Sequence, residues 1–274
     1  VSRNGEILLA KEITGKEESA LADKSTLTIE NIFAFAKKVD LADVREVLER
    51  QVRYNMAIAE EGLCGNYGAN IGKVLLATYG DQDVKVRAKA MAAAGSDARM
   101  NGCELPVVIN SGSGNQGITA SVPVIVYATE LGVDEDTMYR AMALSDLTTI
   151  HQKTPIGRLS AYCGAVSAGA GSGAGIAYLS GASYDEVVHT VINAVAIISG
   201  MVCDGAKASC AAKIAEAVDA GIIGYYMAKR GQNFDDGDGI VTAGIEATIR
   251  NVGRLAKEGM KETNDEIISI MIGS

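Results

Sequence analysis

The chain of 274 residues is long enough for one large or two modest domains, and its 48% hydrophobic content supplies a sizeable core. A formal net charge of −9 without any long Lys/Arg cluster argues against nucleic acid or an anionic membrane surface as a partner. Five cysteines, an odd number without the loop-rich surroundings of a disulfide scaffold, suit free thiols in a reducing cytoplasm. No membrane span is predicted, because the blandest stretches, 161–181 and 187–202, lack aromatic or basic flanks.

The first 26 residues differ from the rest of the chain. Positions 6–13 predict a strand that leads into a charged turn at 14–19, as in the tail of a small αβ unit. From residue 27 to 274 the hydrophobic period is helical, with no internal repeat or low-complexity linker, so this part is predicted to form one helical domain. The expected fold class is therefore mainly α, a multi-helix domain with a short β-containing N-terminal remnant.

Capping residues and glycines indicate where the first helices of that domain begin and end. Helices are predicted at 29–39, at 41–61 behind Asp40 and Asp43, at 71–79, and from a cap at Asp81 to Met100.

A Gly/Ser loop follows a short extended run at 105–110. The segment from Ser111 to Gly117 reads Ser-Gly-Ser-Gly-Asn-Gln-Gly and precedes a predicted helix at 118–131. Such a loop presents N–H and hydroxyl donors at the positive end of a helix, which suits a carboxylate or a phosphate. No Lys follows the last glycine, so the loop is not a P-loop. A tight structural turn is the alternative interpretation.

The next helix is predicted at 134–150, and Pro155 is expected to open the following segment at its first turn. His151 and Lys153 lie between these features. Either side chain is a candidate catalytic base. Either could instead hold the C-terminus of the helix, where positive charge is favoured.

Cys163 opens a run of Gly, Ala and Ser that extends to residue 175. A glycine-dense backbone can approach a bulky inorganic ligand closely and offer it N–H groups. The sequence Ser-Tyr-Asp-Glu at 183–186 predicts a capping box for a helix that Gly200 ends.

Cys203 is then expected in a turn, with Asp204 as the N-cap of a helix at 205–229 that carries Cys210 on its second turn. With Cys203 outside the helix the two thiolates can converge beside a positive helix end. Three thiolates would leave one iron of a cluster open. A zinc site on Cys163, Cys203 and Cys210 is an alternative, since thiolates also bind zinc. Cys64 and Cys103 are expected to be small buried hydrophobes, with Cys103 as a fallback thiol or base.

The spacing of Cys163, Cys203 and Cys210, the approach from Arg158 to Gly164 and the loop at 111–117 resemble the iron–sulfur L-serine dehydratase α-chain family over about residues 28–274. The closer resemblance is to its L-cysteine desulfidase branch. It implies a [4Fe–4S] cluster on the three cysteines, whose uncoordinated iron assists α,β-elimination. L-Cysteine would give pyruvate, ammonia and sulfide, and L-serine pyruvate and ammonia. The substrate-binding side chains would be those of Ser111, Ser113, Asn115 and Gln116.

One departure from that branch is the absence of its N-terminal Gly-Cys-Thr-Glu-Pro motif. An N-terminal segment or a partner chain is therefore expected to complete the site, and a homo-oligomer is left open. The alternative function is a non-catalytic helical subunit that binds a small amino acid and carries a structural cysteine or metal site.

Overall fold

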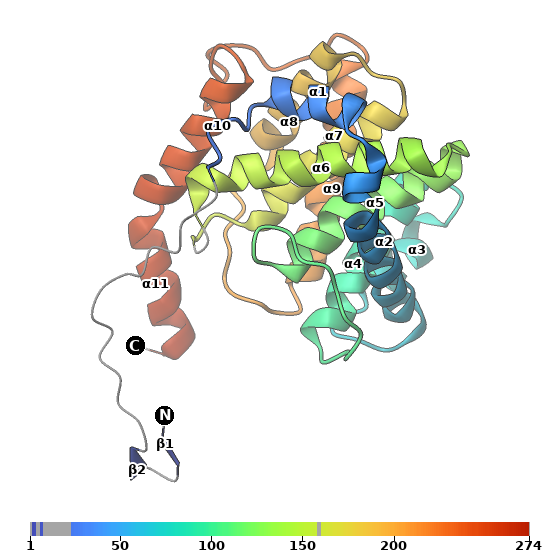
Figure 1. Ribbon diagram of the computed structural model, residues 1–274. Coiled ribbons are helices and arrows are strands. Elements are labelled where there is room, and N and C mark those ends of the chain that lie inside the picture. Colours follow the sequence, from blue (N-terminus) through green and yellow to red (C-terminus); the bar gives the residue numbers. More distant parts are fainter. Residues whose placement is uncertain (1, 4–5, 8–22, 158–159, 274) are drawn as a thin grey trace.

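The computed structural model describes residues 2–3, 6–7, 23–157 and 160–273, and the mainly α class is confirmed (Figure 1). Strands β1 (Ser2–Arg3) and β2 (Glu6–Ile7) pair antiparallel, with Ser2 opposite Ile7. The helical elements are α1 (Ile29–Lys38), α2 (Leu41–Cys64), α3 (Ile71–Tyr79), α4 (Val84–Met100), α5 (Gly114–Leu131), α6 (Glu135–Ile156), α7 (Gly164–Leu179), α8 (Tyr184–Ile198), α9 (Cys210–Ala228), α10 (Ile245–Arg254), the π-helical turn η1 (Leu255–Gly259) and α11 (Lys261–Ile272).

The N-terminal strand prediction is tested only at its beginning. Glu6 and Ile7 are in β2, whereas most of the predicted strand and the turn at 14–19 lie outside the described residues. The division of the chain at residue 27 stays a prediction. Among the helices that the structure describes, none is both long enough and apolar enough to cross a membrane.

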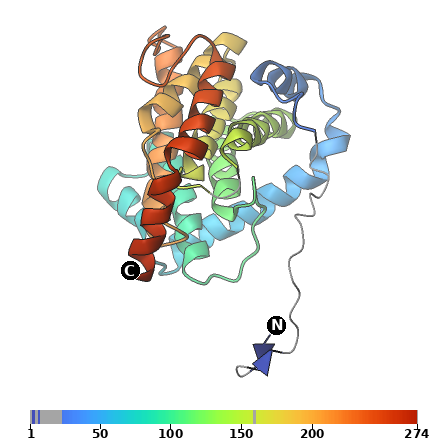
Figure 2. The same cartoon turned by 90° about the vertical axis from the view of Figure 1, so that its left-hand side faces the viewer.

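The centre of the fold is α7, which packs against α5, α6, α8 and α9 (Figures 1 and 2). Every residue from Ala165 to Ala177 is buried. The small residues bring backbones together: a Cβ on Gly173 would lie 2.7 Å from the carbonyl oxygen of Gly221, and one on Gly169 would collide with the carbonyl of Ala217. Since position 169 meets 217 and position 173 meets 221, α7 and α9 run parallel with their N-termini at the same end.

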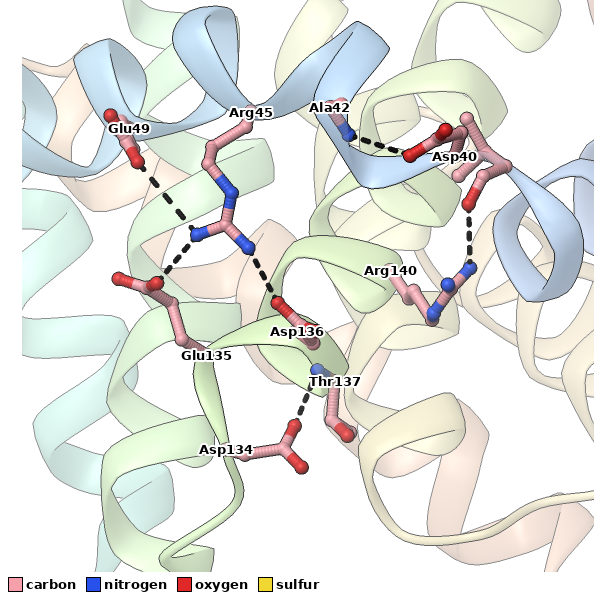
Figure 3. A network of polar contacts seen from close by, with 10 residues as sticks. Asp40, Ala42, Arg45, Glu49, Asp134, Glu135, Asp136, Thr137 and Arg140 are labelled. Atoms are coloured by element: carbon pink, nitrogen blue, oxygen red, sulfur yellow. Dashed lines mark hydrogen bonds and ion pairs between the residues drawn. The ribbon is translucent and has the colours of Figure 1, made fainter.

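An exposed polar seam joins the N-termini of α2 and α6 (Figure 3). The guanidinium of Arg45 lies 2.7 Å from Glu135, 2.6 Å from Asp136 and 3.8 Å from Glu49. Arg140 donates to the carbonyl oxygens of Ala36 and Val39, at the end of α1. These contacts fix how α1 and α2 lie across α6.

The capping signals in the sequence are largely confirmed. Asp40 caps α2 by accepting from the N–H of Ala42, and Ser183 and Glu186 form the predicted capping box of α8. Gly200 follows the end of α8 at Ile198. The cap of α4 is Asp83 and not Asp81, because the Asp83 side chain accepts from the N–H of Lys85.

Three predicted boundaries are wrong. Helix α5 begins at Gly114 and not at 118, because Ser113 caps it inside the Gly/Ser loop. Helix α6 continues to Ile156 with Pro155 in its last turn, so Pro155 does not open the segment of Cys163. Helix α9 begins at Cys210 and not at 205, because Gly205 has a φ of 95°, which a right-handed helix excludes. Asp204 pairs with Lys213 and does not cap the helix.

Candidate active site

Cys163 and Cys203, 40 positions apart in the sequence, are joined by a short antiparallel backbone pairing. Tyr162 and Val202 form the bridged pair. The N–H of Cys163 donates to Met201 at 3.1 Å, and that of Cys203 donates to Ala161 at 2.6 Å. The two cysteines thus flank the bridge on one face as diagonal neighbours, a relation that places Cα atoms ~7–8 Å apart. Cys203 lies outside any helix, as predicted.

Cys210 is the first residue of α9, one turn earlier in its helix than predicted. Its sulfur accepts from the N–H of Lys207 at 3.5 Å and donates to the carbonyl oxygen of Gly205 at 3.4 Å. Lys213, one turn further along α9, donates to the carbonyl of Val202 at 3.1 Å. The start of α9 is therefore tied to the segment that carries Cys203.

The three cysteines share one electrostatic environment. Burial raises the pKa of the Cys163 thiol and the N–H of Ala165 lowers it, while the charges of Cys203 and Cys210 raise it and that of Lys213 lowers it. Cys163 is the N-cap of α7, and Cys210 opens α9. Both thiols therefore lie at positive helix ends, where a thiolate is stabilised. Because the two helices are parallel, these ends are on the same side of the fold.

The thiols of Cys163, Cys203 and Cys210 are chemically able to bind either iron or zinc. All five cysteines are free thiols. Across residues 23–157 and 160–273, no group of three His, Cys, Asp or Glu side chains could hold a metal ion. Zinc needs all its sulfur ligands ~2.3 Å from one point. In an iron–sulfur cluster each thiolate binds its own iron, so more widely spaced cysteines are suitable ligands.

The Gly/Ser loop is at once a tight turn and a helix start. Asn110 and Ser113 form an isolated bridge, and Ser111 has a φ of 50°. The hydroxyl of Ser111 donates to Asn110 at 2.8 Å, and that of Ser113 accepts from the N–H of Gln116 at 3.5 Å. The turn therefore sets the direction in which α5 leaves the loop.

Gln116 connects this loop to the cysteines. Its side chain lies against the backbone of Gly164, where a Cβ would come within 2.6 Å of the amide carbon of Gln116. Gly164 directly follows Cys163, so the N-termini of α5 and α7 are adjacent. Gln116 is only 7% exposed, and its Oε1 has no hydrogen-bond partner among the described residues. A buried carbonyl oxygen without a donor is unusual and is available to a ligand.

Of the two candidate bases, Lys153 lies toward the cysteines. It is 6% exposed, and its ammonium forms no hydrogen bond or ion pair with any residue that the structure describes. Burial lowers its pKa, against the opposing effect of Cys203 and Cys163. His151 instead pairs with Glu246 of α10 at 2.7 Å, and Glu246 also accepts from the N–H of Ile29. His151 thus takes part in holding α1, α6 and α10 together.

Two charged residues of this region are missing from the sequence-based site. Arg99 of α4 donates to Asn115 at 3.2 Å, and its pKa is lowered by burial and raised by the charge of Cys210. Asp146 of α6 accepts from Gln51 at 3.0 Å and from Asn110 at 2.9 Å, and burial raises its pKa to about 6. No motif marks either residue, because their partners are distant in the sequence.

The remaining cysteines lie elsewhere. Cys64 is exposed, so the prediction that it is buried is wrong. Cys103 is half-buried beside Tyr67, whose hydroxyl donates to Glu61 at 2.8 Å.

The serine dehydratase alpha chain family matches residues 5–269. Among curated proteins, UPF0597 protein DSY1109 of Desulfitobacterium hafniense is 62% identical over 272 residues, 99% of this chain and 63% of its own length. A UPF0597 protein of Lachnoclostridium phytofermentans is 54% identical over 99% of this chain and 65% of its own length. UPF0597 protein BF3560 of Bacteroides fragilis is 40% identical over 99% and 64%. The chain thus spans just under two thirds of these relatives. No solved structure matches it.

Proposed function

Since the chain belongs to the serine dehydratase alpha chain family, we propose that it is an iron–sulfur lyase of amino-acid catabolism. The proposed reaction is α,β-elimination from a small 2-amino acid. L-Cysteine would give pyruvate, ammonia and sulfide, and L-serine would give pyruvate and ammonia. Free thiols throughout the chain suit work in a reducing cytoplasm.

The observation that supports this proposal is that the start of α5 contacts the start of α7, and that Cys163 and Cys210 lie at the starts of the parallel helices α7 and α9. Gln116 in the first turn of α5 touches Gly164 of α7, Cys163 caps α7, and Cys210 opens α9. Helix N-termini favour anions. An anionic cluster and the carboxylate of a substrate would both be stabilised here.

Cys163, Cys203 and Cys210 are the residues that would hold a [4Fe–4S] cluster. When bound, such a cluster supplies a Lewis acid at the iron that no cysteine ligates.

Lys153 is the base that we assign to the elimination. Its burial favours the neutral amine, which can accept the Cα proton of the substrate. The electron pair of that C–H bond forms the Cα=Cβ bond. The bond from Cβ to sulfur or oxygen breaks, and the leaving group takes the bonding pair and a proton. The resulting enamine tautomerises to an imine, and water hydrolyses the imine to a 2-oxo acid and ammonia.

Ser111, Ser113, Asn115 and Gln116 would orient the substrate. The Oε1 of Gln116, which has no partner among the residues that the structure describes, can accept a hydrogen bond from the substrate's amino group, because an amide oxygen accepts readily from ammonium. The hydroxyl of Ser111 is held by Asn110, and Asn110 is held by Asp146. The loop is therefore organised before a substrate arrives.

The test is anaerobic reconstitution with iron and sulfide, followed by assays of 2-oxo acid, ammonia and sulfide from a panel of amino acids. The full-length Desulfitobacterium hafniense relative is treated identically. Formation of 2-oxo acid and ammonia in equal amounts supports the proposal. An iron-loaded protein that binds amino acids without turnover, in both this chain and the relative, would favour the non-catalytic binding function.

A further inference from the structure

Arg99 is a half-buried cation without a carboxylate partner in the described part of the chain. Arg87, on the same helix, pairs with Glu130, and Arg45 of α2 pairs with three carboxylates. The contacts of the Arg99 guanidinium are one hydrogen bond to Asn115 and a weak one to the sulfur of Met100, 3.9 Å away. Both come from the same nitrogen, Nη1. The donors on Nη2 and Nε are free of hydrogen bonds to the described residues.

The position of Arg99 is fixed by the start of α5. Its Nε lies directly against the backbone of Gly114, so that a side chain at position 114 would collide with it. Asn115, the next residue, holds Nη1 from the other side. Cys210 is close enough for its charge to act on the guanidinium. Arg99 therefore lies between the Gly/Ser loop and Cys210, and its Nη2 and Nε donors make no hydrogen bond to the described residues.

We propose that Arg99 binds the α-carboxylate of the substrate, with Asn115 as the residue that holds the guanidinium in place. The assignment rests on the proposed lyase function and extends it, because it names the recognition group. A guanidinium offers two parallel N–H donors to the two oxygens of a carboxylate. Amides and esters of the same amino acids, which lack the negative charge, would then be poor ligands.

Gln116 supports this assignment independently. Its buried Oε1, without a partner in the described part of the chain, is an acceptor in the same first turn of α5 that Arg99 contacts. The first turn of α5 would thus bring together an acceptor for an ammonium group, Gln116, and a donor for a carboxylate, Arg99. A 2-amino acid carries these two groups on one carbon. The pairing of donor and acceptor fits a zwitterion better than it fits a phosphate.

The experiment measures binding without turnover, using L-alanine, which has no leaving group on Cβ, and L-alaninamide. Calorimetry on the anaerobic cluster-loaded protein gives both dissociation constants. Arg99→Gln is expected to weaken L-alanine binding by about 10- to 100-fold, the usual effect of losing a hydrogen bond to a charged group, and to leave L-alaninamide unchanged. Arg99→Lys, which keeps the charge but not the fork, should lose about tenfold. Arg87→Gln is the matched control on α4 and should change neither constant.

The outcomes separate this assignment from the lyase proposal. Equal L-alanine affinity in Arg99→Gln and the parent, or no L-alanine binding by the parent, overturns the role of Arg99. Loss of iron from both Arg99 variants, with unchanged affinity per loaded chain, also overturns it and shows that Arg99 serves the cluster. Arg99-dependent binding of L-alanine without elimination from any amino acid would instead overturn the lyase proposal alone. Circular dichroism checks that each variant is folded. In elimination assays of Arg99→Gln, KM for the amino acid should rise by a larger factor than kcat falls.

Discussion

Arg45 at the α2–α6 seam pairs with carboxylates, and so does Lys213 near the cysteines, but in the described part of the chain two further cations at the cysteine end of α7 and α9 do not. At the seam, Arg45 is half-buried and is surrounded by three exposed carboxylates of the chain itself (Figure 3). At the cysteine end, Lys153 and Arg99 are buried or half-buried and have no carboxylate partner among the described residues.

The difference supports the proposal that the cysteine end binds an external anion. Exposed ion pairs contribute ~0–1 kcal/mol, so the seam mainly orients helices. An unpaired cation under the surface costs several kcal/mol, a cost that a bound anion would offset. The thiolates, a cluster and a substrate carboxylate are the anions that this end would accept. The predictions below test that contrast, from the largest expected effect to the smallest.

Replacing Cys203 with Ser should abolish both iron retention and elimination, because it removes one of the three proposed cluster ligands. Iron per chain and initial rates are measured on anaerobic preparations that circular dichroism shows to be folded. Cys64→Ser is the control, since Cys64 is exposed and should leave both quantities intact. Full iron content in Cys203→Ser would contradict the ligand assignment.

Replacing Lys153 with Met should lower the elimination rate by about 10²- to 10⁴-fold, the usual contribution of a general base. The free energy of unfolding should stay the same or rise, because the variant removes a buried amine that has no hydrogen-bond or ion-pair partner among the described residues. Initial rates and urea denaturation test the two parts. A destabilised but active variant would show that Lys153 is structural.

Asp146 should make stability depend on pH. Its pKa is about 6 in the folded chain against a reference value of 3.8. Folding thus favours the protonated form, so the contribution to stability is full below about pH 4 and is lost as the pH rises through 6. The total change is up to about 3 kcal/mol. Denaturation of Asp146→Asn between pH 4 and 8 should lack this component, because Asn still accepts from Gln51 and Asn110. An unchanged pH profile would assign the titration to another group.

Arg45→Met should lower the free energy of unfolding by at most ~1 kcal/mol and leave elimination unaffected, because all its partners are exposed. High salt should reduce the difference from the parent protein. A larger loss would mean that the seam does more than orient α2 on α6.

Local signals allowed the helices and the loop to be predicted, whereas the details of the site depend on contacts over long distances. The capping box at Ser183 and the cap at Asp40 involve residues close together in the sequence, so both could be predicted from it. The late start of α9 follows from the left-handed Gly205, which composition alone does not reveal. Asp146 and Arg99 acquire their partners only when α2, α4, α5 and α6 pack together.

The glycine contact between α7 and α9 has a consequence for repair. The backbones of α7 and α9 are in direct contact at Gly173 and Gly221. No flexible side chain lies between them there, so a change of rotamer cannot alter the spacing of the two helices. Cys163 and Cys210, at the parallel ends of this pair, would keep their spacing in the absence of iron. Oxygen destroys exposed clusters, and most proteins that depend on metal for folding lose their shape with it. This chain should instead keep its fold after losing a cluster. Iron and sulfide alone, without a chaperone, should then rebuild the proposed cluster on its cysteines.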